Sequence, residues 1–188
     1  EPCINGRVVG LGAYFGEDVS GLVERLLGEQ LADGGWNCEQ ENGSIRGSFS
    51  TSINVLEGLA ELDRADKATP PVSEAVARGR EFLLERRLLR RLTTGEIADT
   101  KFTAFLFPPG WHYDVLRGLD YFRAAGVPPD PRMTEAIELV RSKRKDDGRW
   151  LLDWSMPSHV ILREPEALEA PSRWNTLRAL RVLRWWDA

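Results

Sequence analysis

Apolar residues recur at helical spacing in three segments of the chain, and each segment opens with a hydroxyl residue. The segments cover residues 20–31, 73 to about 91 and 134 to about 145. Ser and Thr are favourable at the start of a helix, and Glu74 and Glu135 follow where an acidic side chain suits the helix dipole. The sequence lacks alternating β-branched strands. The pattern therefore predicts three helices.

A second kind of apolar segment carries a small residue at its centre and recurs about every 60 residues. Gly58, Gly118 and Ala179 occupy the small position, and Gly10 occupies it in a partial copy near the start of the chain. A small residue lets two helix backbones approach closely. We therefore expect Gly58 and Gly118 to lie at close contacts between helices of this second kind.

The two kinds of segment alternate, so the sequence predicts three helical hairpins preceded by one helix over residues 2–15. Gly and Pro punctuate the pattern, with Gly-containing turns after the first helices of the hairpins and Pro pairs between the repeats. We predict an all-α protein with one domain over residues 1–188 and repeats at about 17–66, 70–126 and 130–188. Two longer loops, at about 92–110 and 154–171, interrupt the alternation of the two kinds of helix.

Three stretches resemble the QW repeat of squalene and oxidosqualene cyclases. Residues 78–87 match its opening, with Arg87 in place of the Gln, and residues 26–36 keep Gln30 and Trp36 near its end. Residues 140–150 keep Trp150, with Arg144 in the Gln position. The resemblance covers nearly the whole chain and implies the superfamily of squalene cyclases and protein prenyltransferase β-subunits. It implies an α/α toroid in which the Gly-bearing helices form an inner ring around an apolar cavity.

A closed toroid of that superfamily has five to seven helix pairs, as the resemblance implies, whereas this chain supplies three pairs and one leading inner helix. The leading helix carries an apolar stripe of Ile4, Val8, Leu11 and Phe15 that nothing upstream in this sequence covers. Ends of helical repeats normally carry a polar cap. The expected partners are therefore a second copy of the chain, in a homodimer, or missing N-terminal repeats.

In the implied fold, the loops that precede the inner helices open onto the cavity. The candidate binding residues on these loops and helix starts are Trp36, Cys38, Asn54, Trp111, His112, Tyr113, Trp174 and Asn175. Asn54 and Asn175 share a repeat position with Asp114, and the three residues are either helix caps or a polar ring in the cavity. The tryptophans are either core residues that join the repeats or aromatic lining that could bind an apolar isoprenoid or steady a carbocation.

The catalytic motifs of the superfamily are missing from this sequence. Triterpene cyclases use a protonated Asp in an Asp-x-Asp-Asp or Asp-Cys-Thr-Ala-Glu motif, and the candidate acid here is Asp114, beside aromatic residues. Zinc-binding residue types occur at Cys38, Glu39, His112 and Asp114, but their spacing does not match the prenyltransferases. We therefore predict no bound metal and no cofactor, and whether the protein is an enzyme stays open.

Charge and composition exclude several classes of binding partner. The 188 residues carry a net charge of −4, which argues against a nucleic-acid surface, and no apolar run approaches the length of a transmembrane helix. The two cysteines favour a reduced compartment, so we expect a cytoplasmic protein. Two function classes remain: an isoprenoid-handling enzyme related to cyclases or prenyltransferases, and a non-catalytic module that binds an apolar ligand or a partner protein.

Overall fold

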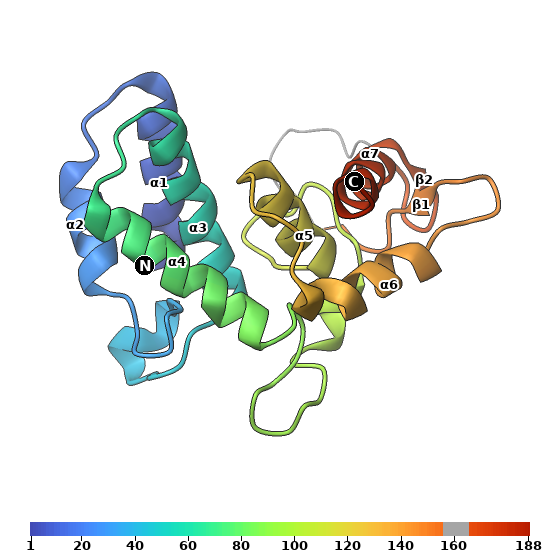
Figure 1. Cartoon of the computed structure of the whole chain (residues 1–188), viewed down its shortest axis with the longest axis horizontal. Coiled ribbons are helices and arrows are strands. Elements are labelled where there is room, and N and C mark those ends of the chain that lie inside the picture. Colours follow the sequence, from blue (N-terminus) through green and yellow to red (C-terminus); the bar gives the residue numbers. More distant parts are fainter. Residues whose placement is uncertain (156–165) are drawn as a thin grey trace. The chain divides into compact units, whose positions relative to one another are not determined.

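Seven α-helices and three short 3₁₀-helices together make up most of the residues that the computed structural model describes, which are residues 1–155 and 166–188 (Figure 1). In this part of the chain the strands form a single two-stranded sheet. The prediction of an all-α protein is confirmed, whereas the toroid and the assignment to a single domain stay predictions. The predicted loop at about 154–171 lies largely outside the described residues.

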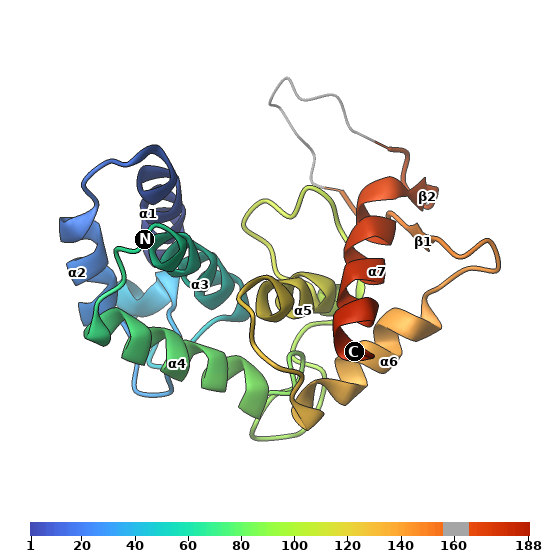
Figure 2. The same ribbon diagram turned by 45° about the horizontal axis from the view of Figure 1, so that its top comes forward.

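Contacts within the chain divide it into two compact units, Glu1–Glu85 and Arg86–Ala188, and each is described by itself. Unit 1 begins with the predicted leading helix, and α1 lies alongside α3 in both ribbon views (Figures 1 and 2). The elements of unit 1 are α1 (Pro2–Phe15), α2 (Ser20–Gly28), the 3₁₀-helix η1 (Cys38–Asn42), α3 (Phe49–Arg64) and α4 (Pro70–Glu85).

Glycines allow the backbones of α1 and α3 to pack in direct contact. A Cβ atom added to Gly58 would overlap the carbonyl oxygen of Gly6 and lie 2.7 Å from its carbonyl carbon. A Cβ on Gly10 would lie 3.2 Å from the Cα of Gly58. No side chain larger than hydrogen fits where two backbones come this close. The expected helix contact at Gly58 is therefore confirmed.

The boundary between the units falls within the middle repeat, since α4 belongs to unit 1 and α5 to unit 2. The sheet of unit 2 closes the turn between the last two helices. Trp150 pairs with Ser172 and Leu151 with Pro171 in antiparallel register. The elements of unit 2 are the 3₁₀-helix η2 (Thr100–Thr103), α5 (Val115–Ala124), the 3₁₀-helix η3 (Pro131–Met133), α6 (Thr134–Ser142), β1 (Trp150–Leu151), β2 (Pro171–Ser172) and α7 (Arg173–Trp186).

Gly118 serves a different contact from the one expected. A Cβ atom on Gly118 would lie 2.5 Å from the hydroxyl oxygen of Tyr113, so the glycine makes room for a side chain just before its own helix. The expectation that Gly118 lies at a contact between two inner helices is wrong. The reason is that the Tyr113 ring folds back over the first turn of α5 and occupies that space.

The same turn follows α2 in unit 1 and α6 in unit 2. Gly34 and Gly148 adopt positive φ angles of 82° and 80°, which glycine tolerates without strain. The buried indole of Trp36 then donates a hydrogen bond to the carbonyl of Leu26 at 2.7 Å, and Trp150 donates to Val140 at the same distance. These contacts place both tryptophans in the core.

Trp36 also joins two repeats. A Cβ atom on Gly79 of α4 would lie 2.8 Å from the Trp36 ring, so the indole packs between α2 and α4.

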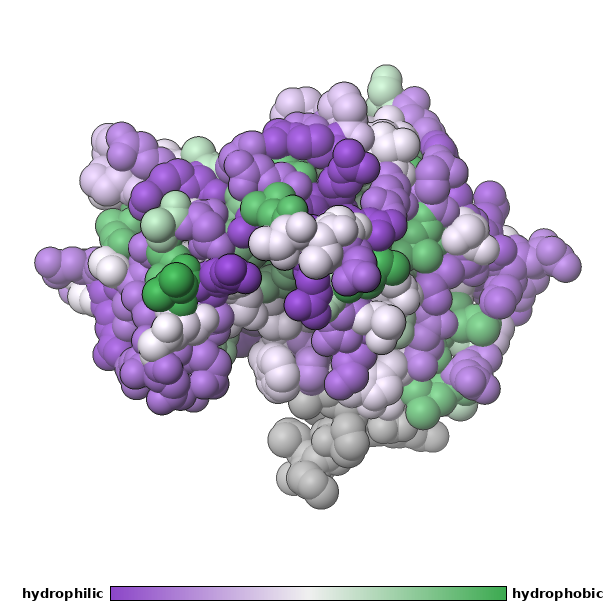
Figure 3. Space-filling model, turned by 90° about the horizontal axis from the view of Figure 1, so that it is seen from below, coloured by the Kyte–Doolittle hydropathy of each residue, from purple (hydrophilic) through white to green (hydrophobic). Residues whose placement is uncertain are grey.

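On the face drawn in Figure 3, hydrophilic side chains predominate and hydrophobic ones gather in small groups. Among the described residues, no helix combines the length and the apolar character that crossing a bilayer requires.

Candidate functional site

Asp114 lies at the start of α5, where it is fully buried and caps the helix. Its carboxylate accepts hydrogen bonds from the backbone N–H of Arg117 at 2.8 Å and of Leu106 at 3.3 Å. Burial raises the pKa of Asp114, and the positive charges of Arg178 and Arg117 act in the opposite direction. The carboxylate therefore fastens the loop that contains Leu106 to the first turn of α5.

Side chains of α7 also fasten this loop. The buried Asn175 amide donates hydrogen bonds to the carbonyls of Phe105 at 3.2 Å and Leu151 at 3.0 Å. Arg178 donates to the carbonyl of Leu106 at 3.2 Å. Because buried polar groups are costly unless they are paired, this network fixes one conformation of the loop.

Five aromatic side chains, three of them on the loop that this network holds, form two groups of contacting rings. Phe107 stacks on Trp174, with ring centroids 4.9 Å apart and planes 10° apart. His112 stacks on Trp111 at 3.7 Å and meets the edge of Trp154 at 4.7 Å. We call Phe107, Trp111, His112, Trp154 and Trp174 the aromatic cluster; within it, Trp111 is 53% exposed and Trp174 is 42% exposed. Three of the candidate binding residues therefore take part in these ring contacts.

The surroundings of His112 favour the neutral ring, which stacks on an aromatic neighbour without a desolvated charge. Burial lowers the pKa of His112, and the positive charges of Lys101 and Arg117 lower it further. The imidazole is therefore neutral at pH 7. A neutral ring stacks on Trp111 without the cost of placing a charge beside an apolar surface.

Two other candidate residues lie in the core. The buried Tyr113 hydroxyl donates a 2.6 Å hydrogen bond to the carbonyl of Leu88, beyond the end of α4. Trp36 makes the equivalent bond to α2 in unit 1. The core interpretation therefore holds for Trp36, whereas Tyr113, which was expected to line the cavity, instead fastens the turn that contains Leu88.

The shared repeat position of Asn54, Asp114 and Asn175 has three different structural roles. Only Asp114 caps a helix, because α3 and α7 begin earlier relative to this position and are capped by Ser48 and Ser172. Asn54 lies inside α3, where its side-chain oxygen accepts a 2.7 Å hydrogen bond from Arg7 of α1. The cap interpretation therefore holds for Asp114 and is corrected for the two asparagines.

Unit 1 contains a cavity that the sequence analysis did not anticipate. Its volume is about 540 Å³, and it is lined by α2 along its length, by residues at the ends of α1 and α3 and by the start of α4. None of the candidate binding residues lines it. Its lining is Gly16, Glu17, Asp18, Val19, Ser20, Val23, Glu24, Leu27, Leu62, Lys67, Thr69 and Val72. In the sequence, the spacing of Val19, Val23 and Leu27 at every fourth position could have indicated that these three residues face the same side and line one cavity.

The suggested zinc-binding residue types fall in both units. Cys38 and Glu39 belong to unit 1, and His112 and Asp114 belong to unit 2. Asp114 is already engaged by two backbone N–H groups. Among the described residues, the potential metal ligands that do lie together are Glu1, Cys3 and Cys38, whose ligand atoms are within 4.8 Å of one another.

Comparisons of the chain with models of protein families, with curated proteins and with solved structures found no match. The resemblance to squalene cyclases therefore stays a prediction, and the site itself has to carry any functional proposal.

Proposed function

We propose that this chain is a squalene-cyclase-like helical-repeat domain that binds an isoprenoid or another apolar ligand at the aromatic cluster. The observation that carries the proposal is the pair of exposed rings, Trp111 and Trp174, each stacked on a second ring. Aromatic faces give large apolar contact area with little loss of side-chain entropy. The buried network beneath the loop keeps the rings in place before a ligand arrives, which lowers the entropic cost of binding.

The contacts of Asp114 favour binding over catalysis. A catalytic acid must reach the substrate, whereas both hydrogen bonds of this carboxylate go to the backbone of its own unit and its side chain is fully buried. Asp114 therefore acts as a positioning residue for the aromatic cluster. Its raised pKa follows from burial and needs no catalytic explanation.

Calorimetric titration with farnesol, kept below the concentration at which it aggregates, tests the proposal. We expect saturable binding by the wild type and a loss of about tenfold in affinity for Trp111→Ala or Trp174→Ala, because each change removes one exposed aromatic contact. Phe15→Ala is the matched control, since Phe15 is an exposed aromatic residue in unit 1. Absence of binding, or equal losses in all three variants, would contradict the proposal.

A second candidate function, binding of a protein partner, has support from two exposed helix faces. Ile4, Val8, Leu11 and Phe15 are all at least 44% exposed on α1, as the predicted stripe requires. Leu177 and Leu180 are exposed on α7. By contrast, Trp185 and Trp186 are half-buried, and Trp185 donates a hydrogen bond to the carbonyl of Val127 at 3.0 Å.

Sedimentation equilibrium separates this candidate from the first. If a second copy covers the α1 stripe, the wild type forms dimers and Leu11→Glu dissociates them. Ile45→Glu is the control, because Ile45 is an exposed apolar residue outside both helix faces. A monomeric wild type that still binds farnesol would favour the ligand-binding function alone.

A further inference from the structure

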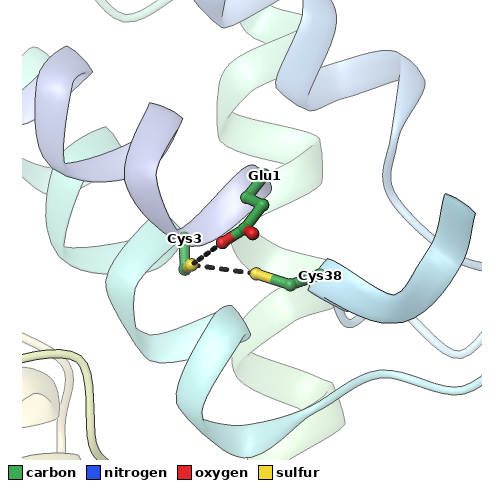
Figure 4. A group of neighbouring side chains, drawn as sticks. All are labelled: Glu1, Cys3 and Cys38. Carbon is green, nitrogen blue, oxygen red and sulfur yellow. Dashed lines mark hydrogen bonds between the residues drawn. The ribbon is translucent and has the colours of Figure 1, made fainter.

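Two cysteines that lie far apart in the sequence meet in unit 1. The Sγ atoms of Cys3 and Cys38 are 2.8 Å apart, although 35 positions separate them along the chain. Figure 4 shows Cys3 on the first turn of α1 facing Cys38 at the start of η1. Both are free thiols and both are half-buried, so small reagents can reach them.

The fold enforces this proximity because α3 positions both cysteines. α1 is held on α3 by the glycine contact of Gly6 and by the hydrogen bond from Arg7 to Asn54. Cys38 is held on α3 separately, since its backbone N–H donates to the Thr51 hydroxyl at 3.4 Å. Two independent attachments to one helix therefore bring the thiols together.

We propose that Cys3 and Cys38 form a reversible intramolecular disulfide, with a low-molecular-weight disulfide such as glutathione disulfide as the oxidant. A disulfide bond is about 2.05 Å long, so the sulfur atoms need to approach by less than about 1 Å. The bond would tie the first turn of α1 to η1 and close the covalent loop between them.

The exchange takes two balanced steps. The Cys38 thiolate attacks one sulfur of glutathione disulfide, which forms a mixed disulfide and releases one glutathione thiolate. The Cys3 thiolate then attacks the Cys38 sulfur of the mixed disulfide and releases the second glutathione. The protein loses two protons and two electrons, and glutathione disulfide is reduced to two molecules of glutathione.

The surroundings of Cys3 assign the order of these steps. Burial, the neighbouring Cys38 and the charge of Glu1 raise the pKa of the Cys3 thiol to about 12. Cys3 is therefore the poorer initial nucleophile. Once Cys38 is bound in the mixed disulfide, its thiol no longer raises the pKa of Cys3, and Cys3, which faces the Cys38 sulfur, becomes the resolving thiol.

Exchange in glutathione buffers tests the proposal on the full chain. The reduced protein is incubated with glutathione disulfide, alkylated and mapped by mass spectrometry. We expect a Cys3–Cys38 peptide in the monomer, reversal by dithiothreitol, and a melting temperature higher by about 5 °C or more in the oxidised form, because the bond restricts the unfolded chain. Cys3→Ser should instead accumulate a glutathione adduct on Cys38, and Cys38→Ser should react more slowly.

Three outcomes would overturn the proposal. In the first, both cysteines stay reduced or each carries its own glutathione. In the second, the cross-link forms only between chains. In the third, the purified protein holds one zinc ion that shields both thiols, which would make Glu1, Cys3 and Cys38 a metal site instead. Formation of the bond with an unchanged melting temperature would contradict the claim that the fold presents the thiols ready to bond.

Discussion

The two units fill the space beside their Gly-bearing helices in different ways. In unit 1, α1 and α3 meet backbone to backbone, with Gly58 against Gly6. In unit 2, the helix α5 carries the equivalent Gly118, but that glycine receives the Tyr113 ring, and a loop is held between the starts of α5 and α7 by buried polar side chains. The same repeat pattern therefore occurs with two kinds of contact. In unit 1 two helix backbones pack directly on each other, and in unit 2 a loop held by polar side chains lies between two helices.

The difference indicates where each unit is vulnerable. A contact between two backbones cannot adjust, because neither partner has a side chain that could rotate away. A contact built from a side chain and a polar network can shift, but it depends on charge and on complete hydrogen bonding. Substitutions at equivalent positions should therefore have unequal effects in the two units.

The largest effect is expected for Gly58→Ala. The new methyl group would overlap the Gly6 carbonyl oxygen, so α1 would have to move away from α3. We expect the free energy of unfolding to fall by about 3 kcal/mol or more, measured by urea denaturation. Gly21→Ala is the control, because nothing lies within 4 Å of a Cβ there and alanine favours a helix. A mild effect at Gly58 would show that α1 does not pack on α3 as described.

The helix boundaries were largely predictable from the sequence, because periodicity and capping residues are local signals. The expected helices over 20–31 and 134–145 are observed as α2 and α6, although both end a few residues earlier than expected. The second helix of this kind starts at Pro70 rather than Ser73 and ends at Glu85. The expectation extended it because Leu88 and Leu89 continue the apolar pattern, but positive φ angles at Arg87 and Leu88 stop the helix.

The surroundings of the candidate residues were less predictable, because they depend on contacts between distant segments. The shared slot of Asn54, Asp114 and Asn175 suggested one role, yet the three helices begin at different distances from it. Nothing local in the sequence shows that Tyr113 folds back onto Gly118, or that Cys3 meets Cys38. The aromatic cluster was partly anticipated through Trp111, His112 and Trp174, whereas Phe107 and Trp154 were missed.

A smaller effect is expected for Gly118→Ala. The added methyl group would press on the Tyr113 hydroxyl, which is the end of a side chain and can move at the expense of its bond to Leu88. We expect a loss of about 1–2 kcal/mol in the free energy of unfolding. The double variant Gly118→Ala with Tyr113→Phe relieves the clash. Its loss in the free energy of unfolding should therefore be smaller than the sum of the losses in the two single variants. Strict additivity would show that the two residues are not in contact.

The smallest effect concerns the charge of Asp114, where burial and two arginines oppose each other. Because the pKa of Asp114 is raised in the folded state, the folded protein holds this proton more tightly than the unfolded chain does. The contribution of Asp114 to stability is then greatest below about pH 3.9, the ordinary Asp value, and declines as the pH rises through the folded pKa. The difference in unfolding free energy between the wild type and Asp114→Asn, measured from pH 3.5 to 7, should therefore shrink with rising pH. Asparagine keeps the helix cap and removes the titration, which makes it the matched variant. The opposite result would be a wild type whose unfolding free energy increases relative to that of Asp114→Asn as the pH rises. It would show that Arg117 and Arg178 affect the pKa of Asp114 more than burial does, and that an ionised carboxylate holds the network beneath the aromatic cluster.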